Sequence, residues 1–301
     1  MPCFTRLPRL AKIAATVDTM KIAALNYMSK DTAISSYQGI VNIVLDSTAL
    51  AKFSFFVTSL KGLQALSGTQ NGFGGDFRFG KTGQGSGLLG ADSICQCLAE
   101  RSMPGSKAKI WRAFLSVNKD AAGKPVNAID RIGKGPWYDR LGRLVSNTTS
   151  DLLHSRPNAD AAIKNDLPNE DGVPNHRPDP NQPAVDNHQF VTGSDTLGKL
   201  FPSTDTSNST CQDWTSATAG GGKPRCGLSW PRMAMSKSSA SEASGMGPSP
   251  GNMQSWISVW NLFGCEAGLD LSETSGRGKR GVYTIGNGGG YGGFYCFALN
   301  P

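Results

Sequence analysis

The placement of its cysteines constrains this chain more than any other feature. Six of the seven lie between residues 95 and 296, and none belongs to a Cys-x-x-Cys pair. Cys95-Gln96-Cys97 has no second half that would complete a tetrahedral zinc site. Cysteines spread in this way are typical of disulfide-bonded proteins, whereas the alternative is a cytosolic protein with buried thiols. We therefore expect a secreted or cell-surface protein. The seven cysteines are Cys3, Cys95, Cys97, Cys211, Cys226, Cys265 and Cys296.

The amino terminus fits an exported protein poorly. Asp18 and Lys21 interrupt its apolar residues, so no clear signal peptide is present, and no lipid-attachment cysteine follows. Apolar positions in residues 9–30 recur at helical spacing and predict an amphipathic helix. We therefore expect an amino-terminal helical arm or non-native leader at residues 1–52 and one main domain at residues 53–301. No apolar run approaches the roughly 18 residues that cross a bilayer, so no membrane span is expected.

The main domain is expected to combine short strands with few helices. Residues 109–117 alternate between two faces and predict a strand. Asp92 is expected to cap a helix that ends near Gly105. One helix among many short strands favours an α+β fold over a doubly wound sheet. Further expectations are a strand at 53–59, a glycine-rich loop at 63–90, a hairpin with strands at 137–138 and 143–145, a loop at 165–187 and a strand at 294–299.

Binding of nucleic acid or nucleotide is not expected. The formal net charge is +7, but no dense stripe of Lys and Arg is interleaved with aromatic residues. Residues 75–82 (GDFRFGKT) match the P-loop pattern, yet a polar, glycine-rich stretch precedes them and more glycines follow, where a strand and a helix are required. Residues 85–90 (GSGLLG) match the dinucleotide pattern, but no β-α units follow.

We do not expect an enzyme. The chain has neither a serine elbow set between a predicted strand and a predicted helix nor the zinc-protease helix motif. His154, His176 and His188 lie in loop-like sequence and lack the spacing that would pair them on one helix face.

An acidic loop is the best candidate for a metal site. Its oxygen-bearing side chains follow one another at short intervals, and calcium takes six to eight oxygen ligands. Nearby His176 and His188 would suit zinc instead. The alternative is a solvated loop whose Asn and Asp side chains bond their own turns. The candidate ligands of a structural Ca²⁺ are Asp166, Asn169, Glu170, Asp171, Asn175 and Asp186.

Several short motifs, taken in order, resemble a known fold family. Residues 90–96 (GADSICQ) followed by 111–116 (WRAFLS) resemble the opening of the endostatin module of certain collagens. The chain is still more similar to a bacterial family of uncharacterised secreted proteins that share this C-type-lectin-like fold. Further matches are residues 193–195 (GSD), 211–216 (CQDWTS) and 294–297 (FYCF), so the resemblance spans about residues 53–299. It implies a twisted antiparallel sheet with one or two helices and long irregular loops.

The resemblance also implies two nested disulfides, Cys95–Cys296 and Cys211–Cys265. Cys226 lies in an additional stretch and could replace either member of the second pair. Cys97 follows Cys95 by two residues and so points about 200° away on a helix, where it stays free or meets Cys226. Closing a loop of about 200 residues restricts the unfolded chain by roughly 4 to 5 kcal/mol.

Activities of related folds do not carry over directly. Sugar-binding C-type lectins hold calcium with Glu-Pro-Asn or Gln-Pro-Asp and Trp-Asn-Asp. Residues 173–175 (VPN) and 177–179 (RPD) lack the first ligand, and no Trp-Asn-Asp follows. A sulfatase-activating oxidase with a related fold uses reactive cysteines, and Cys95 and Cys97 are the one close pair here.

We therefore expect an extracellular or cell-surface binding or adhesion module, because long loops on a disulfide-pinned sheet are where such a scaffold places recognition. Its partner would be a glycan, a protein or a matrix polymer. The alternative is a structural subunit that self-assembles into a surface layer or filament, with the amino-terminal helix as assembly arm.

Overall fold

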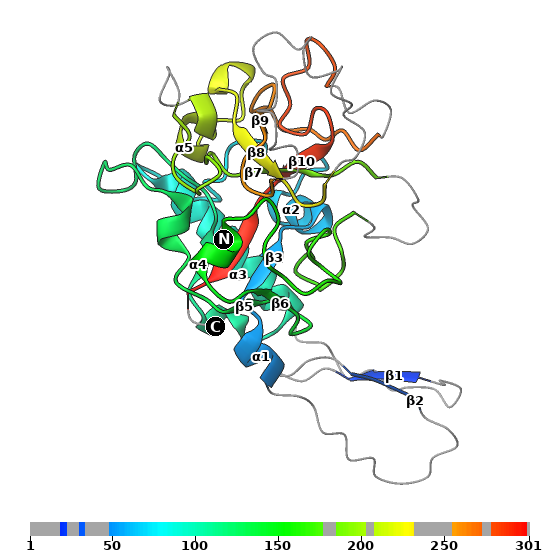
Figure 1. Cartoon of the computed structure of the whole chain (residues 1–301). Coiled ribbons are helices and arrows are strands. Elements are labelled where there is room, and N and C mark those ends of the chain that lie inside the picture. The colour runs from blue at the N-terminus through cyan, green and yellow to red at the C-terminus, as the bar shows by residue number, and fades with distance from the viewer. Residues whose placement is uncertain are drawn as a thin grey trace.

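The structure is a computed structural model, and it describes residues 19–22, 30–33, 48–176, 185–202, 208–231, 255–272 and 278–299 (Figure 1). The helices are α1 (Thr48–Lys52), α2 (Leu60–Ser67), α3 (Ser86–Ser102), α4 (Thr149–Leu152) and α5 (Cys211–Trp214). The strands are β1 (Thr19–Ile22), β2 (Lys30–Ala33), β3 (Phe55–Val57), β4 (Trp111–Ala113), β5 (Trp137–Tyr138), β6 (Leu144–Ser146), β7 (Gln189–Val191), β8 (Arg225–Leu228), β9 (Trp260–Asn261), β10 (Gly290–Gly293) and β11 (Tyr295–Ala298). Short strands and few helices confirm the α+β class.

A three-stranded antiparallel sheet forms the centre, in the order β3–β11–β4. The last strand of the chain therefore lies between two early ones, with Cys296 opposite both Phe56 and Ala113. All residues of β3 and β11 are buried. The expected strands at 53–59, 109–117 and 294–299 thus form one sheet, although each is shorter than its sequence pattern.

A second sheet has the order β10–β7–β8–β9 and is not wholly antiparallel. β7 pairs antiparallel with β8, but β10 pairs parallel with β7. The antiparallel pairing expected from the resemblance therefore holds in this sheet except at its β10 edge, where the glycine-rich β10 returns from the long carboxyl-terminal segment. The expected hairpin is confirmed, since β5 and β6 pair antiparallel around a turn at 139–142.

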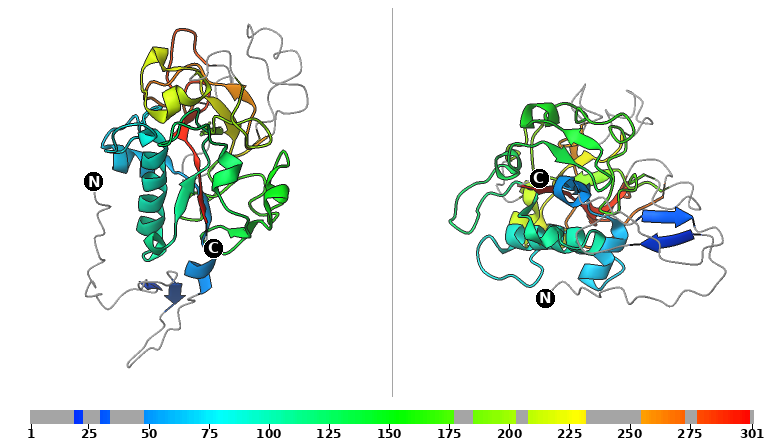
Figure 2. Two further views of the ribbon diagram at one scale, coloured as in Figure 1. Left: turned by 90° about the vertical axis from the view of Figure 1, so that its left-hand side faces the viewer. Right: turned by 90° about the horizontal axis from the view of Figure 1, so that it is seen from below.

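Helix α3 runs alongside the central sheet and packs against β4 and β11 (Figure 2). It begins at Ser86, after Gly85 in the left-handed conformation, and ends at Ser102. Asp92 therefore lies inside the helix, and its expected role as the cap is wrong. The reason is that Gly85 ends the preceding loop seven residues earlier, while the Asp92 carboxylate bonds groups of the sheet.

The described part of the amino-terminal region is β structure. β1 and β2 pair antiparallel, with Thr19 opposite Ala33 and Ile22 opposite Lys30. The helix expected over 9–30 is therefore wrong at 19–22, where Met20 and Ile22 alternate with polar residues at the period of a strand. The rest of that expected helix, apart from Lys30, lies outside the described residues.

Aromatic side chains fill the core between α3 and the sheets. Phe53, Phe56 and Trp111 form one fully packed group, with ring centroids 5.1 to 5.8 Å apart. Trp256 packs against Tyr295 on β11 with a centroid distance of 4.9 Å. Each large aromatic side chain buries much apolar area. A few of them therefore suffice to form a core, although the helices and strands around it are short.

Two disulfides fasten this core. Cys95 in α3 is bonded to Cys296 in β11, and Cys211 is bonded to Cys265. These are the two pairs that the endostatin-like resemblance implies. Cys226 is buried and unbridged, whereas Cys97 is disulfide-bonded, so the two alternatives considered for Cys97 are both wrong. The disulfides and the fold class are compatible with an extracellular location.

Candidate functional site

Five of the six candidate calcium ligands form hydrogen bonds with other protein groups. Glu170 is fully buried, and its carboxylate accepts hydrogen bonds from the N–H and hydroxyl of Ser59, at 2.9 and 2.7 Å, and from Arg101 at 3.1 Å. Ser59 caps α2. Burial raises the pKa of the Glu170 carboxyl, and the hydrogen bonds from Ser59 oppose that shift. Glu170 therefore fastens the start of α2 to the end of α3.

The other candidate ligands bond protein groups in different directions. Asn169 accepts from the N–H groups of Asp171 and Val173, which is the turn-forming role that the alternative interpretation assigned. Asp166 accepts from the His176 N–H at 2.9 Å, and Asp171 is exposed. Asn169 and Asp166 therefore bond backbone N–H groups of the loop in which they lie.

The remaining two candidates lie in the core. Asn175 donates to Ser229 Oγ and accepts from the Tyr291 hydroxyl. Asp186 bonds the His188 imidazole. In the described ranges no three His, Cys, Asp or Glu side chains form a group suited to a metal ion. Calcium binding stays a prediction, and residues 177–179 of the lectin-like triplet lie outside the described residues.

The glycines of the two nucleotide-like motifs have a packing role. A Cβ at Gly87 would overlap the carbonyl oxygens of Asp213 and Trp214, and one at Gly90 would overlap those of Phe77 and Arg78. Both glycines let α3 lie directly on neighbouring backbone. The pattern of residues 85–90 therefore reflects close helix packing.

Two histidines meet around Trp230. The His176 ring stacks on Trp230 with a centroid distance of 3.8 Å, and His188 meets Trp230 and Trp260 edge-on. His188 has no exposed surface. The sequence spacing of these histidines gave no sign that they would meet.

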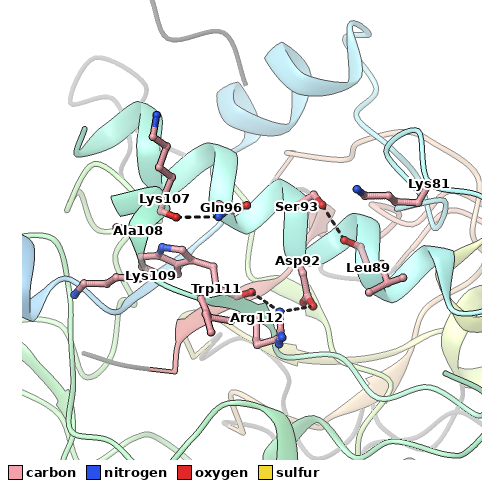
Figure 3. A pocket seen from close by; sticks show the side chains of 11 residues that line it. Lys81, Leu89, Asp92, Ser93, Gln96, Lys107, Ala108, Lys109, Trp111 and Arg112 are labelled. Carbon is pink, nitrogen blue, oxygen red and sulfur yellow. Dashed lines mark hydrogen bonds and ion pairs between the residues drawn. The ribbon is translucent and has the colours of Figure 1, made fainter. Parts of the chain in front are cut away.

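An open groove of about 350 Å³ lies between α3 and β4 (Figure 3). Ser93 and Gln96 line it from α3, and the chain leading into β4 forms the opposite wall. Gln96 Nε2 donates to the Lys107 carbonyl at 3.0 Å, so the two walls are directly bonded. The lining residues are Lys81, Leu89, Asp92, Ser93, Gln96, Lys107, Ala108, Lys109, Ile110, Trp111 and Arg112.

The groove is positively charged, with four cationic side chains against the one carboxylate of Asp92. Asp92 is 7% exposed and is already paired with Arg131 at 2.9 Å and with Arg112 at 3.2 Å. It also accepts from the Ala113 N–H at 2.9 Å. Because Asp92 is paired with these two arginines, it does not neutralise Lys81 or Lys107.

Lys109 contributes its stem to the groove wall, while its ammonium is held elsewhere. Its Nζ donates to the carbonyl oxygens of Ala51 and Phe53 at 2.6 and 2.9 Å. Burial lowers the pKa of Lys109 to about 8, because desolvation disfavours the charged amine. The bonds join the start of β4 to the segment before β3.

The apolar part of the groove is exposed. Leu89 on α3 has 48% of its surface accessible and Ile110 has 46%, although both lie beside well-packed elements. Sequence inspection had not identified this site. The short basic run of Lys107, Lys109 and Arg112 beside an outward-facing Ile110 is the signal that could have indicated it.

No helix within the described residues is both long and apolar enough to cross a membrane. Comparison of the chain with protein-family models gives no match, and a search of curated proteins gives none either.

Proposed function

We propose that this protein is a secreted or cell-surface binding module with an endostatin-like, C-type-lectin-like domain, and that it binds its ligand in the groove between α3 and β4. The observation that carries this proposal is the charge of that groove, whose exposed Lys81 and Lys107 face no carboxylate of the lining except that of Asp92, which is paired with Arg112 and Arg131. Like charges placed together in a concave surface favour an anionic ligand and attract it from a distance.

The rigidity of the walls supports a binding role. Cys95 fixes α3 to β11, and β4 pairs with the same strand through Ala113 and Cys296. Both walls are therefore attached to one buried strand. A site held in its binding conformation loses less conformational entropy on binding.

Binding without catalysis agrees with the placement of the reactive side chains. Cys95 is bridged, and burial raises the pKa of the unbridged Cys226 thiol to about 12, so a thiolate is not formed at neutral pH. His188 is buried away from the groove. The groove itself is lined by lysine, arginine, amide, hydroxyl and apolar groups around one paired carboxylate.

An array of glycans, peptides and matrix polymers tests the proposal. The full chain is compared with Lys81→Glu/Lys107→Glu, which reverses two exposed charges of the groove. The control is Lys61→Glu/Lys223→Glu, which makes the same charge change at exposed positions outside it. We expect ligands that bind the parent and the control but not the groove variant. Identical array profiles for all three proteins would refute a ligand site at this groove.

A further inference from the structure

We infer that the groove between α3 and β4 docks a short acidic peptide segment of a partner protein, one that carries apolar side chains between its carboxylates. This inference rests on the proposed function and names its ligand class. The inference depends on the presence of cationic and exposed apolar side chains in one groove. The cations select carboxylates of the ligand, and the apolar side chains select apolar side chains of the ligand.

The charges define where carboxylates would bind. Lys81 lies beside the amino-terminal half of α3 and Lys107 follows its carboxyl-terminal end, so they lie far apart along the groove (Figure 3). Lys107 is 65% exposed, and its nearest described carboxylate, that of Glu100, is 3.9 Å away. The Arg112 side chain is 35% exposed, and its guanidinium is paired with Asp92. The two exposed ammonium groups thus mark two separate positions for anionic groups in the groove.

The apolar side chains distinguish a peptide from a uniform polyanion. Leu89 and Ile110 each leave nearly half of their surface in water, directly beside these cations. Burying apolar surface contributes about 25 cal/mol per Å², and only a ligand with apolar side chains of its own gains this energy here. A sulfated or carboxylated polysaccharide would cover Leu89 and Ile110 with polar groups.

Polar groups of α3 suit a peptide backbone. Gln96 and Ser93 are half-buried, lie one turn apart and line the groove. The Gln96 amide nitrogen is bonded to the Lys107 carbonyl, which turns its oxygen into a fixed acceptor. A backbone N–H is the donor that a peptide offers at every residue except proline.

The size of the groove limits the segment. A volume of about 350 Å³ is near the lower end of the range of roughly 300 to 1,000 Å³ that is usual for ligand pockets. The groove therefore holds a few residues of a peptide rather than a folded domain. A contact of this size gives a weak, salt-sensitive complex.

Fluorescence anisotropy with short labelled peptides tests the inference. The probes alternate Asp or Glu with Leu or Phe, and matched probes carry Ser in place of the apolar residues. The full chain is compared with Lys81→Glu/Lys107→Glu, with Leu89→Gln/Ile110→Thr and with the control Lys61→Glu/Lys223→Glu. Thermal melting of each variant verifies that it is folded. We expect the acidic–apolar peptides to bind the parent and the control equally and to bind both groove variants at least about tenfold more weakly.

Other outcomes separate this inference from the proposed function. Two outcomes overturn the peptide inference but leave a groove-binding module. In the first, the Ser-containing probes bind as tightly as the acidic–apolar probes. In the second, a sulfated glycan binds the parent and the apolar variant but does not bind the charge variant. Binding of every probe unchanged in both groove variants, or no binding of peptides and glycans to the parent, overturns both.

Discussion

Removing the disulfide between α3 and β11 should have the largest effect on stability of any change considered for this chain. Cys95 and Cys296 are 201 residues apart, and the inner disulfide shortens the covalent path between them by 54 residues, to about 147. The chain-entropy relation for the unfolded state then gives about 5 kcal/mol for the outer bond and about 4 kcal/mol for the inner one. Whole domains are stable by only about 5 to 15 kcal/mol.

The assay is urea unfolding of Cys95→Ala/Cys296→Ala beside Cys211→Ala/Cys265→Ala. All four sulfur positions are fully buried, so the cavity left by each pair is similar and largely cancels in the comparison. Because the effect is on the unfolded chain, we expect the slope of unfolding free energy against urea to rise and the unfolding rate to change little. A loss below about 2 kcal/mol for the outer pair, or a loss that arises wholly from faster unfolding, would refute this reasoning.

Three smaller perturbations test other parts of the structure. Asp92→Asn leaves the nearly buried Arg131 without its counter-charge and should lower the free energy of unfolding by about 3 kcal/mol, measured by urea. Gln212→Gly should raise the melting temperature, because Gln212 has φ 55° and is exposed, and left-handed backbone costs a side-chain-bearing residue about 1 to 2 kcal/mol. For Lys109→Met the test is pH: the unfolded amine titrates near 10.4 and the folded one at about 8, so between these values the unfolded state binds more protons and the parent gains stability as pH rises. The difference in urea midpoint between parent and Lys109→Met should therefore move in favour of the parent from pH 7.5 to 9.5.

Each of these three variants has a matched control. Asp76→Asn breaks a pair with Arg78 whose side chains are 27% and 48% exposed, and it should cost less than about 1 kcal/mol. Gln64→Gly places the same substitution in the right-handed α2 and should lower the melting temperature. Lys107→Met removes an exposed amine, and its urea midpoint over the same pH range is the reference for Lys109→Met. An equal loss at Asp76 and Asp92, a lower melting temperature for Gln212→Gly, or a flat profile for Lys109→Met would contradict the corresponding argument.

The strands were predictable from the sequence because burial leaves a local signal. The run from Phe53 to Val57 is apolar except for Ser54, and its last three residues form the buried edge strand of the central sheet. The hairpin at 137–146 was predictable for a similar reason, since its turn residues stand between two apolar pairs. What could not be read locally is how far each strand pairs, because β4 ends at Ala113, near the point where its antiparallel partner β11 begins.

Asp92 shows why the start of α3 was misplaced. An aspartate before an apolar helical pattern normally caps the helix, and sequence alone cannot reveal that Arg112 and Arg131 approach it from other segments. Two glycines suggest a ligand site that the structure explains by packing. Gly87 and Gly90 match a nucleotide-binding motif, but glycine is required at these positions because the backbone of residues 213–214 and 77–78 lies directly against them. The groove could not be predicted for the same reason, because Lys81 and Lys107 precede and follow α3 in the sequence and line one groove only in the folded chain.

The turn at Cys211–Trp214 connects these observations. Its four residues all have φ between 48° and 63°, the left-handed region, and none of them is glycine. By the usual cost per residue this backbone is unfavourable by roughly 4 to 8 kcal/mol. Its stabilising contacts are the disulfide at Cys211, the Asp213 carboxylate that accepts from the Asn118 N–H at 2.7 Å, and the Trp214 indole that donates to Ser116. Helix α3 lies on this turn through Gly87, so the inner disulfide offsets strain directly beneath the helix that lines the groove. The two disulfides therefore act on the same wall: the outer bond fixes α3 to the sheet, and the inner bond holds the turn on which the first turn of α3 rests.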